Sequence, residues 1–393
     1  MRLLWIATKP PAPPTDGGRL VACETLRALA AAGHAITVVA PAAPGAAADA
    51  RRAAESAGIA LEAIEASPRS WARAACAAVA RGLPVTIVRH EHAALAARVD
   101  ALLAARRFDV AHAEQLQAYA ACTPAERRGI PVVLRAQNVE SEVWAQGAGR
   151  GVAYRFEARR LARFEGQAVR AAAATLALTA RDADRLRTLG GDGARVVHVP
   201  APFVATLAPG ERLPGAPAIV APASVGWAPN DEARAWLVDA VWPAIAAALP
   251  AARLHLFGGA RSTPGSTGVV HHPAPADSRS AFPADAIVLV VLRTPAGVRM
   301  RILEAWARGL PVVSTPAAVA GLDGGADAVV TADHPAGIAA AIAALAADPP
   351  RRAALVAAGT AVLRDRHDPA RVAAALGAVY ASAARGSSNA GRG

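Results

Sequence analysis

The amino-acid sequence predicts an α/β protein made of two doubly wound domains, each built on an open parallel sheet. A strand-like run at Leu3–Thr8 is followed by a helix-like stretch at Arg19–Ala32 and a second strand-like run at Ala35–Ala40. The same order recurs where apolar runs at Ala286–Leu292 and Pro311–Thr315 flank a helix-length gap. Alternation of this kind gives parallel strands joined by crossover helices.

The length and apolar content of the chain predict two domains with separate cores, and they predict no membrane-spanning helix. The chain has 393 residues, which is too many for one ordinary core. Its hydrophobic share is 54%, but much of it is alanine, and no run of roughly 18 strongly apolar residues occurs. Met1 and Arg2 lead directly into a strand rather than a signal peptide, so we expect a cytoplasmic protein.

The net charge of +11 comes almost entirely from arginine, since Lys9 is the only lysine. The arginines are scattered along helices, as at Arg155, Arg159 and Arg163, and aromatic residues make up only 4% of the chain. This pattern argues against a nucleic-acid partner. It leaves open a peripheral contact between helix faces and an anionic membrane, at its inner face.

No metal site is expected. Cys23, Cys76 and Cys122 are widely spaced and have no metal-binding pattern. Residues 90–92, His-Glu-His, resemble a ligand cluster, but no second group of Cys, His or carboxylate has a matching spacing.

The remaining elements continue the alternation of strands and helices. Further strands are expected at 85–88, 110–112, 132–134, 175–178, 196–199, 219–225 and 253–257, and further helices at 231–248, 335–347, 350–363 and 369–384. A stretch rich in proline, alanine and glycine, 200–222, is typical of a linker. The predicted divisions are 1–214 for an N-terminal domain with its linker, 215–370 for a C-terminal domain, 371–385 for a C-terminal helix that can cross back to the N-terminal domain, and 386–393 for a disordered tail.

Two loops after strands carry polar residues suited to a ligand. The first, Lys9–Gly18, ends in Asp16, Gly17 and Gly18 just before a helix, where paired glycines allow close approach to the backbone. A plain proline-rich connection explains it equally well. The second follows the strand at 132–134, and it carries Arg135, Gln137, Asn138 and Glu140. These side chains suit sugar hydroxyls, although Asn138 or Ser141 capping the next helix explains part of the pattern.

The helix expected at 298–308 has the features of a diphosphate site. Gly297 precedes it, and Arg299 and Arg301 lie in its first turn, where the helix dipole disfavours positive charge unless an anion compensates. Glu304, one turn later, suits ribose or sugar hydroxyls. The alternative is ordinary ion pairing within the helix, since Glu304 lies three residues after Arg301 and four before Arg308. The spacing leaves both interpretations open.

Four motifs in order resemble the family 4 glycosyltransferases of the GT-B fold, especially those of bacterial exopolysaccharide synthesis. They are KPPAPPTDGGR, PVVLRAQNVESEVW, GWAPNDEARAWL and GVRMRILEAWARGLPVVST. The resemblance implies two Rossmann-like domains facing each other across a cleft. It also implies a nucleotide sugar held by the C-terminal domain, a glycan or lipid-linked acceptor held by the N-terminal domain, and metal-independent transfer with retention. No cofactor is implied.

The resemblance also suggests roles for individual residues. Glu304 matches a glutamate that meets the nucleotide ribose, Gly17 and Gly18 match a loop near the donor phosphates and the acceptor, and Arg299 or Arg301 matches a basic position near the diphosphate. The expected catalytic residues are Arg299, Arg301 and Gln137. The expected donor contacts are Gly17, Gly18, Gly297, Val298, Glu304 and Asn230, and the expected acceptor contacts are Asp16, Arg135, Asn138 and Glu140.

Three positions depart from the family pattern. Ala296 replaces a first glutamate, Gln137 replaces a histidine, and residues 226–230 offer only Asn230 where a basic residue is common. Such a transfer needs no protein nucleophile, because the leaving phosphate oxygen can take the acceptor's proton and the arginines can stabilise its charge. The alternatives are a catalytically degenerate relative that binds nucleotide or a partner transferase without turnover, and a sugar-nucleotide epimerase, for which the chain has too few acid and base groups.

Overall fold

The computed structural model describes residues 1–146, 151–222, 228–258, 267–275, 277–293 and 297–390. Within them the chain divides into two compact units. Unit 1 comprises Met1–Pro14, Gly18–Pro202 and Pro369–Gly393, and unit 2 comprises Thr15–Gly17 and Phe203–Asp368. Each unit contains one parallel sheet, so the predicted α/β class is confirmed. No helix among the described residues is long and apolar enough to cross a membrane.

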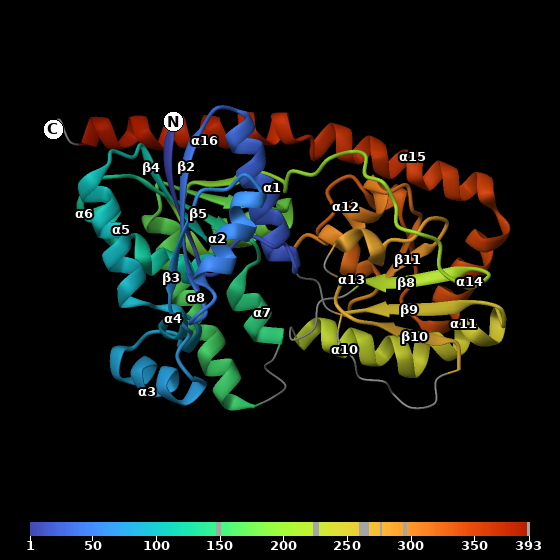
Figure 1. The fold of residues 1–393 in the computed structure, drawn as a ribbon. Helices are drawn as coiled ribbons and strands as arrows, with labels where there is room; N and C mark the ends of the chain where they lie inside the picture. Colours follow the sequence, from blue (N-terminus) through green and yellow to red (C-terminus); the bar gives the residue numbers. More distant parts are fainter. Residues whose placement is uncertain (147–150, 223–227, 259–266, 276, 294–296, 391–393) are drawn as a thin grey trace. The chain divides into compact units, whose positions relative to one another are not determined.

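Unit 1 is built on a 7-stranded sheet in the order β3-β2-β1-β4-β5-β6-β7 (Figure 1). In that order the strands are Leu61–Glu65, Ala35–Ala42, Arg2–Ala7, Val110–Glu114, Val132–Ala136, Ala174–Ala177 and Val196–His198. Its helices are α1 (Gly17–Ala31), α2 (Ala47–Ser56), α3 (Trp71–Arg81), α4 (Val85–His90), α5 (Ala93–Ala105), η1 (Leu116–Cys122), α6 (Thr123–Arg127), α7 (Glu140–Gln146), α8 (Val152–Ala171), α9 (Ala180–Gly190) and α16 (Pro369–Ala390).

Helices cover both faces of the unit 1 sheet. Alternate residues of β1 point to opposite sides, so Leu4 and Ile6 pack with α4, α5, α8 and α9, whereas Leu3 and Trp5 pack with α1, α2 and α16. A strand buried on both faces has no polar side, which explains the unbroken apolar run at the start of the chain. The result is a doubly wound layer structure.

Unit 2 repeats this plan on a 6-stranded sheet in the order β10-β9-β8-β11-β12-β13. In that order the strands are Val269–His272, Arg253–Phe257, Ala218–Pro222, Ile287–Val290, Val312–Ser314 and Val330–Thr331. Its helices are α10 (Ala228–Trp236), η3 (Leu237–Val241), α11 (Trp242–Ala248), η4 (Ser278–Ala281), α12 (Met300–Ala307), α13 (Pro316–Val319), η5 (Ala326–Ala328), α14 (Pro335–Ala347) and α15 (Pro349–Arg366).

Two sequence expectations differ from the structure in type. Residues 85–88 were expected as a strand, but they form the short helix α4, which ends at His90. The run is apolar because Thr86, Ile87 and Val88 are buried, and four residues are too few to distinguish a buried helical turn from a strand. The helix expected at 231–248 is interrupted by the π-helical turn η3.

One glycine in unit 2 allows two helices to pack at short range. Gly359 of α15 lies against the indole of Trp306 in α12, and a Cβ atom at this position would come within 2.4 Å of the ring. Trp306 is itself 1% exposed, and its Nε1 donates to the carbonyl oxygen of Ala328 at 3.2 Å. The ring therefore has little freedom to move aside.

We expect Gly359→Ala to lower the free energy of unfolding by about 1–3 kcal/mol, because the added methyl overpacks this contact. Gly386→Ala is the matched control. This glycine is also helical, but an added Cβ would meet no atom within 4 Å, so the substitution should be neutral or slightly stabilising. Chemical denaturation of both variants measures the difference, and equal effects would contradict the packing argument.

Candidate functional site

The strand order of unit 1 reverses direction between β1 and β4. The chain runs from β1 outward to β2 and β3, then returns to β4 on the other side of β1. In open parallel sheets ligands bind at the carboxyl ends of the strands, at such a switch point. A cavity of about 10 Å³, with room for a single water molecule, lies here. Its lining includes Thr8, Lys9, Gly18, Arg19, Glu114, Gln115 and Gln137.

Gln137 is the centre of the hydrogen bonds at this point. Its Nε2 donates to the carbonyl oxygen of Gly18 at 3.1 Å and to the carboxylate of Glu114, and its Oε1 accepts from Nε2 of Gln115 at 3.0 Å. The side chain is 7% exposed. The structure thus brings together Gln137 and Gly18, two of the expected site residues, although they are far apart in the sequence.

Gln115 was not among the expected site residues, and its backbone is unusual. With φ 72° and ψ 155° it occupies a region that is almost restricted to glycine, at a cost of about 1–3 kcal/mol. Three contacts hold it there: its amide N donates to the carbonyl oxygen of Arg135 at 2.9 Å, its Oε1 accepts from the Thr8 hydroxyl at 2.8 Å, and its Nε2 bonds to Gln137. Strain of this kind is concentrated at functional sites.

Beneath Gln137 lies the buried carboxylate of Glu114. It forms hydrogen bonds with the side chains of Gln137, Arg135 and His112. Arg135 Nε lies 2.8 Å and Nη2 2.7 Å from Glu114 Oε2, and His112 Nε2 lies 3.2 Å from the same oxygen. Burial raises the pKa of Glu114, but the opposing effects of Arg135 and His112 outweigh it and hold that pKa below its usual value. Glu114 is therefore a buried anion.

The network continues to the C-terminal helix. The Tyr380 hydroxyl lies 3.0 Å from Nδ1 of His112, and the Trp5 ring stacks on the imidazole at 3.7 Å. Burial lowers the pKa of His112 to about 4, so the imidazole is neutral at physiological pH. The hydrogen bonds then fix one tautomer, in which Tyr380 donates to Nδ1 and Nε2–H donates to Glu114.

Arg135 lies inside this network rather than at the surface. It is 2% exposed, and it also donates to the Thr25 hydroxyl. Arg135 was expected to contact an acceptor. In the structure its guanidinium instead bonds to Glu114 and holds that carboxylate in place.

Glu140 and Glu165 form a second group of carboxylates after β5. Glu165 is 1% exposed and accepts from the backbone N of Glu140 at 2.8 Å, from the backbone N of Ser141 at 3.1 Å and from the Ser141 hydroxyl at 2.6 Å. Glu165 thus binds the first turn of α7, a role the sequence analysis considered for Asn138 or Ser141. Burial and the neighbouring Glu165 raise the pKa of half-buried Glu140 to about 7, and Gln117 donates to it at 3.1 Å.

Gly17 and Gly18 were expected in the loop before the helix at 19–32, but in the structure they form the first turn of α1. The helix begins at Gly17, and a Cβ there would meet no atom within 4 Å. Arg19 Nε donates to the carbonyl oxygen of Pro10 at 3.1 Å, which ties the loop to the helix start. Asp16 and Asn138 are both half-buried.

In unit 2 the strand order reverses between β8 and β11. Asn230 lies in the first turn of α10, which follows β8, and the Gly297–Arg299 segment leads from β11 to α12. Gly297 has φ 50°, and Gly297, Val298 and Arg299 are half-buried. Gly226, Trp227 and Ala296 lie outside the described residues.

Glu304 is buried within ion pairs. It is 1% exposed, its Oε2 lies 3.0 Å from Nη1 of Arg301, and its Oε1 lies 3.0 Å from Nη2 of Arg308. Arg308 in turn bonds to Ser278 Oγ at 3.1 Å and to the carbonyl oxygen of Ala208. The ion pairing considered as the alternative for Glu304 is therefore present. A guanidinium has five N–H donors, so the bond from Arg301 to Glu304 leaves capacity for an anion.

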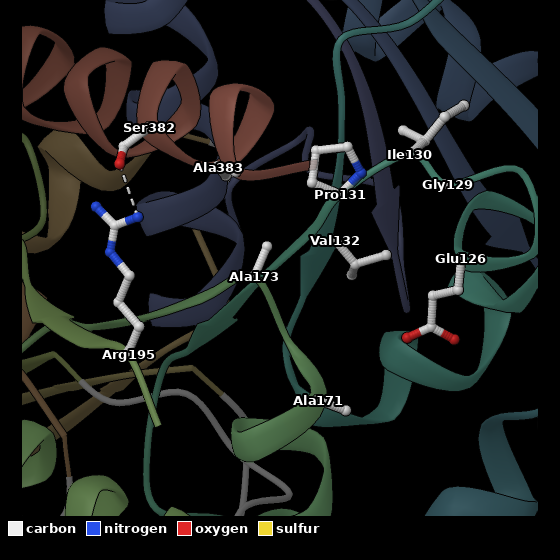
Figure 2. Close-up of a pocket in the computed structure, with 11 residues that line it drawn as sticks. Glu126, Gly129, Ile130, Pro131, Val132, Ala171, Ala173, Arg195, Ser382 and Ala383 are labelled. Carbon is white, nitrogen blue, oxygen red and sulfur yellow. Dashed lines mark hydrogen bonds between the residues drawn. The ribbon is translucent and has the colours of Figure 1, made fainter. Parts of the chain in front are cut away.

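A larger hollow of about 360 Å³ lies elsewhere in unit 1 (Figure 2). It is bordered by Val132 at the start of β5, Ala173 before β6 and Arg195 before β7, and Arg195 donates to Ser382 at 2.8 Å. These are the amino ends of the strands. The hollow therefore lies at the edge of the sheet opposite the switch point, away from the candidate site.

The described residues contain no group of three or more His, Cys, Asp or Glu arranged to hold a metal ion. Of the histidine-containing run at 90–92, Glu91 pairs with Arg81, and His90 Nδ1 lies 2.8 Å from the carbonyl oxygen of Thr86.

The two parallel sheets and their switch points define a protein of two Rossmann-like domains. A model described as "Glycosyl transferase 4-like domain" matches residues 16–202, and a model described as "Glycosyl transferases group 1" matches residues 216–348. The chain therefore belongs to the family 4 glycosyltransferases of the GT-B fold. No curated protein sequence matches it.

Solved structures with the same fold align over nearly the whole chain. HepE of Anabaena in complex with UDP-glucose is 15% identical with a TM-score of 0.67, covering 97% of this chain and 100% of that one. Sucrose-phosphate synthase of Thermosynechococcus elongatus is 14% identical with a TM-score of 0.69, covering 97% and 98%. A glycosyltransferase of Rickettsia africae is 10% identical with a TM-score of 0.64, covering 97% and 98%.

The buried neutral histidine predicts a pH dependence of stability. Because the folded pKa of His112 is about 4 and an unfolded histidine titrates near 6.5, the unfolded state binds the extra proton between these values. The free energy of unfolding should fall by about 3 kcal/mol as the pH drops from about 6.5 to about 4. His112→Gln keeps a donor and an acceptor without titrating, so its curve over this range should be flatter. Denaturation at several pH values checks this, and parallel curves would refute it.

The positive φ of Gln115 predicts that a glycine variant is more stable than an alanine variant, which is the reverse of the usual order. Gln115→Gly and Gln115→Ala both remove the side-chain amide, but only glycine relieves the positive φ. We expect the glycine variant to be more stable than the alanine variant by about 1–3 kcal/mol. At an ordinary position alanine is the more stable of the two. Equal stability in denaturant titrations, or greater stability of the alanine variant, would show that the position is not strained.

Proposed function

We propose that this glycosyltransferase moves a sugar from a nucleotide diphosphate donor to a glycan or lipid-linked acceptor. In this proposal unit 2 binds the donor and unit 1 binds the acceptor. HepE, which has the same fold, is solved with UDP and with UDP-glucose, which supports a nucleotide-sugar donor. The observation that carries the proposal is the start of α12, where Arg299 and Arg301 stand at the positive end of the helix dipole.

The proposed donor contacts combine the positive charge of Arg301 with backbone groups at the start of α12. Arg301 is about one-fifth exposed and is oriented by Glu304, so its remaining N–H groups suit the diphosphate. Gly297 and Val298 bring backbone close to the same helix start, and Asn230 lies in the first turn of α10, the helix after β8. Gly17 is proposed to approach the donor phosphates, and Glu304 the ribose through lone pairs that its ion pairs leave available.

The proposed acceptor contacts lie beyond the carboxyl ends of β1 and β5. Gln137, Gly18, Asn138 and Glu140 present amide, carbonyl and carboxyl groups that suit sugar hydroxyls. Asp16 is proposed to join them from the loop before α1. Arg135, through Glu114, would position Gln137 rather than touch the acceptor.

The proposed transfer proceeds with retention and without a metal. As the bond between the sugar and the diphosphate breaks, negative charge grows on the leaving oxygen, and Arg299, Arg301 and the amides of α12 would stabilise it. The leaving oxygen would take the proton of the acceptor hydroxyl, so no side-chain nucleophile is needed. Gln137 would orient the acceptor. We further propose a role in cell-surface or exopolysaccharide synthesis, at the cytoplasmic side of the membrane.

A second candidate is a relative that binds nucleotide or a partner transferase without turnover. Gln137 favours it, because its amide cannot act as an acid or a base where related enzymes carry a histidine. The buried ion pairs of Glu304 favour it as well, since both carboxylate oxygens are already engaged. Intact nucleotide binding without release of nucleotide from any sugar conjugate would identify this case.

The test is thermal stabilisation of the full chain by UDP, GDP, dTDP, ADP and their sugar conjugates. A ligand at 100 times its dissociation constant stabilises by about 2.7 kcal/mol. We expect one nucleotide to raise the melting temperature and Arg301→Ala to abolish the shift. Glu304→Gln should weaken it, since the neutral amide orients Arg301 less firmly.

Arg351→Ala, at an exposed arginine of α15, is the matched control and should keep the full shift. A shift that survives in Arg301→Ala would place the nucleotide elsewhere. No shift with any nucleotide would refute the donor site.

A further inference from the structure

Two helices of unit 1 expose large apolar side chains to solvent. On α3, Trp71 is 55% and Val79 is 77% exposed, and on α8, Val152 is 80% and Phe156 is 61% exposed. Among the described residues, these four make up most of the large apolar side chains that are exposed to solvent. We call the exposed residues of α3 and of the first half of α8 the α3–α8 face.

Side-chain contacts link the two helices of the α3–α8 face. Arg160 of α8 donates to the carbonyl oxygen of Ala78 in α3 at 2.7 Å. At the other end, Trp71 meets the ring of Trp144 with centroids 6.2 Å apart, and Trp144 meets Tyr154 of α8 at 5.7 Å. The exposed apolar groups therefore form one surface that spans both helices.

The exposed charges on these two helices have a single sign. On α3 they are Arg73 and Arg81. This helix contains no acidic residue, and Arg81 is paired with Glu91, which follows α4. On α8 the two carboxylates, Glu157 and Glu165, are 6% and 1% exposed, so they point into the unit. The outward charges of α8 are arginines, among them Arg155, Arg159 and Arg163.

Another arginine is placed over an aromatic ring at the edge of the same surface. The guanidinium carbon of Arg89 lies 4.6 Å from the centre of the Trp71 ring. Arg160 lies 5.5 Å from the ring of Phe156 in the same way. These stacked pairs keep positive charge beside exposed aromatic surface, an arrangement suited to a boundary between anionic groups and an apolar layer.

We propose that the α3–α8 face binds the surface of an anionic lipid bilayer. The arginines would lie among the anionic headgroups, and Trp71, Phe156, Val79 and Val152 would enter the boundary with the acyl chains. Tryptophan favours this depth because its ring is apolar and its N–H is polar. The excess of exposed arginines, with apolar groups between them, complements a fluid anionic layer.

The position of the face also bears on the acceptor, a consequence that rests on the proposed function. Trp144 of the aromatic cluster lies on α7, and the first residue of α7 is Glu140, a proposed acceptor contact. A bilayer on this face would thus lie next to the element that presents Glu140. This favours a lipid-linked acceptor over a soluble one.

The test uses the full chain and sucrose-loaded vesicles of phosphatidylcholine, with or without 30% phosphatidylglycerol. We expect cosedimentation at least about tenfold stronger with the anionic vesicles. The double variant Arg155→Glu/Arg159→Glu should reduce it about tenfold, and Phe156→Ser should reduce it as well. The matched control is Arg106→Glu/Arg107→Glu, at two exposed arginines outside the face, which should change binding less than about twofold.

Cys76 reports directly on the face. It is exposed on α3, whereas Cys23 and Cys122 are buried, so a polarity-sensitive fluorophore can be attached at this position. Its emission should shift to shorter wavelength with anionic vesicles. Equal loss of binding in both double variants would show that net charge alone drives association and would overturn the proposal. So would cosedimentation without a shift at Cys76, or self-association of the chain through this face in sedimentation velocity without vesicles.

Discussion

The carboxylate of Glu114 is the interaction on which the candidate acceptor site depends. It is a buried anion, and it receives hydrogen bonds from three directions: Arg135 on the neighbouring strand, His112 two residues earlier and Gln137 at the end of β5. Losing one partner of a buried charge pair is costly, because the remaining charge is left unsolvated. Glu114 therefore fixes the ends of β4 and β5 relative to each other, and with them the backbone of Gln115 and the start of α1.

Unit 2 uses a similar device for a different purpose. Glu304 lies between Arg301 and Arg308, and Arg308 extends to Ser278 and to the carbonyl oxygen of Ala208. One carboxylate thus orients a proposed phosphate contact on one side and anchors a long irregular segment on the other. The local ion pairing and the proposed ligand role of Glu304 are compatible, since the ion pair determines where the guanidinium of Arg301 points.

Much of the fold could be predicted from the sequence, because most strands are short, mostly apolar runs bounded by loop residues. The strands at 61–65, 269–272 and 330–331 were missed, since they lie at or near sheet edges and carry polar residues such as Glu62 and His271. The site was predicted in part. Gln137 and Gly18 do meet, but the expected strand at 110–112 ends two residues before Glu114 and three before Gln115. A pairing between β4 and β5 is needed to place these residues beside Gln137, and no local pattern contains it.

The return of the last helix to unit 1 has a consequence for the order in which the chain folds during synthesis. The core on one face of the first sheet includes Val372, Leu376, Val379 and Tyr380, so it is incomplete until α16 has left the ribosome. Until then Trp5 and His112 lack their packing contacts with α16. Domains at the beginning of a chain generally fold first. Here the segment between Phe203 and Asp368 can complete its own core earlier, and the part of the protein that is made first is finished last.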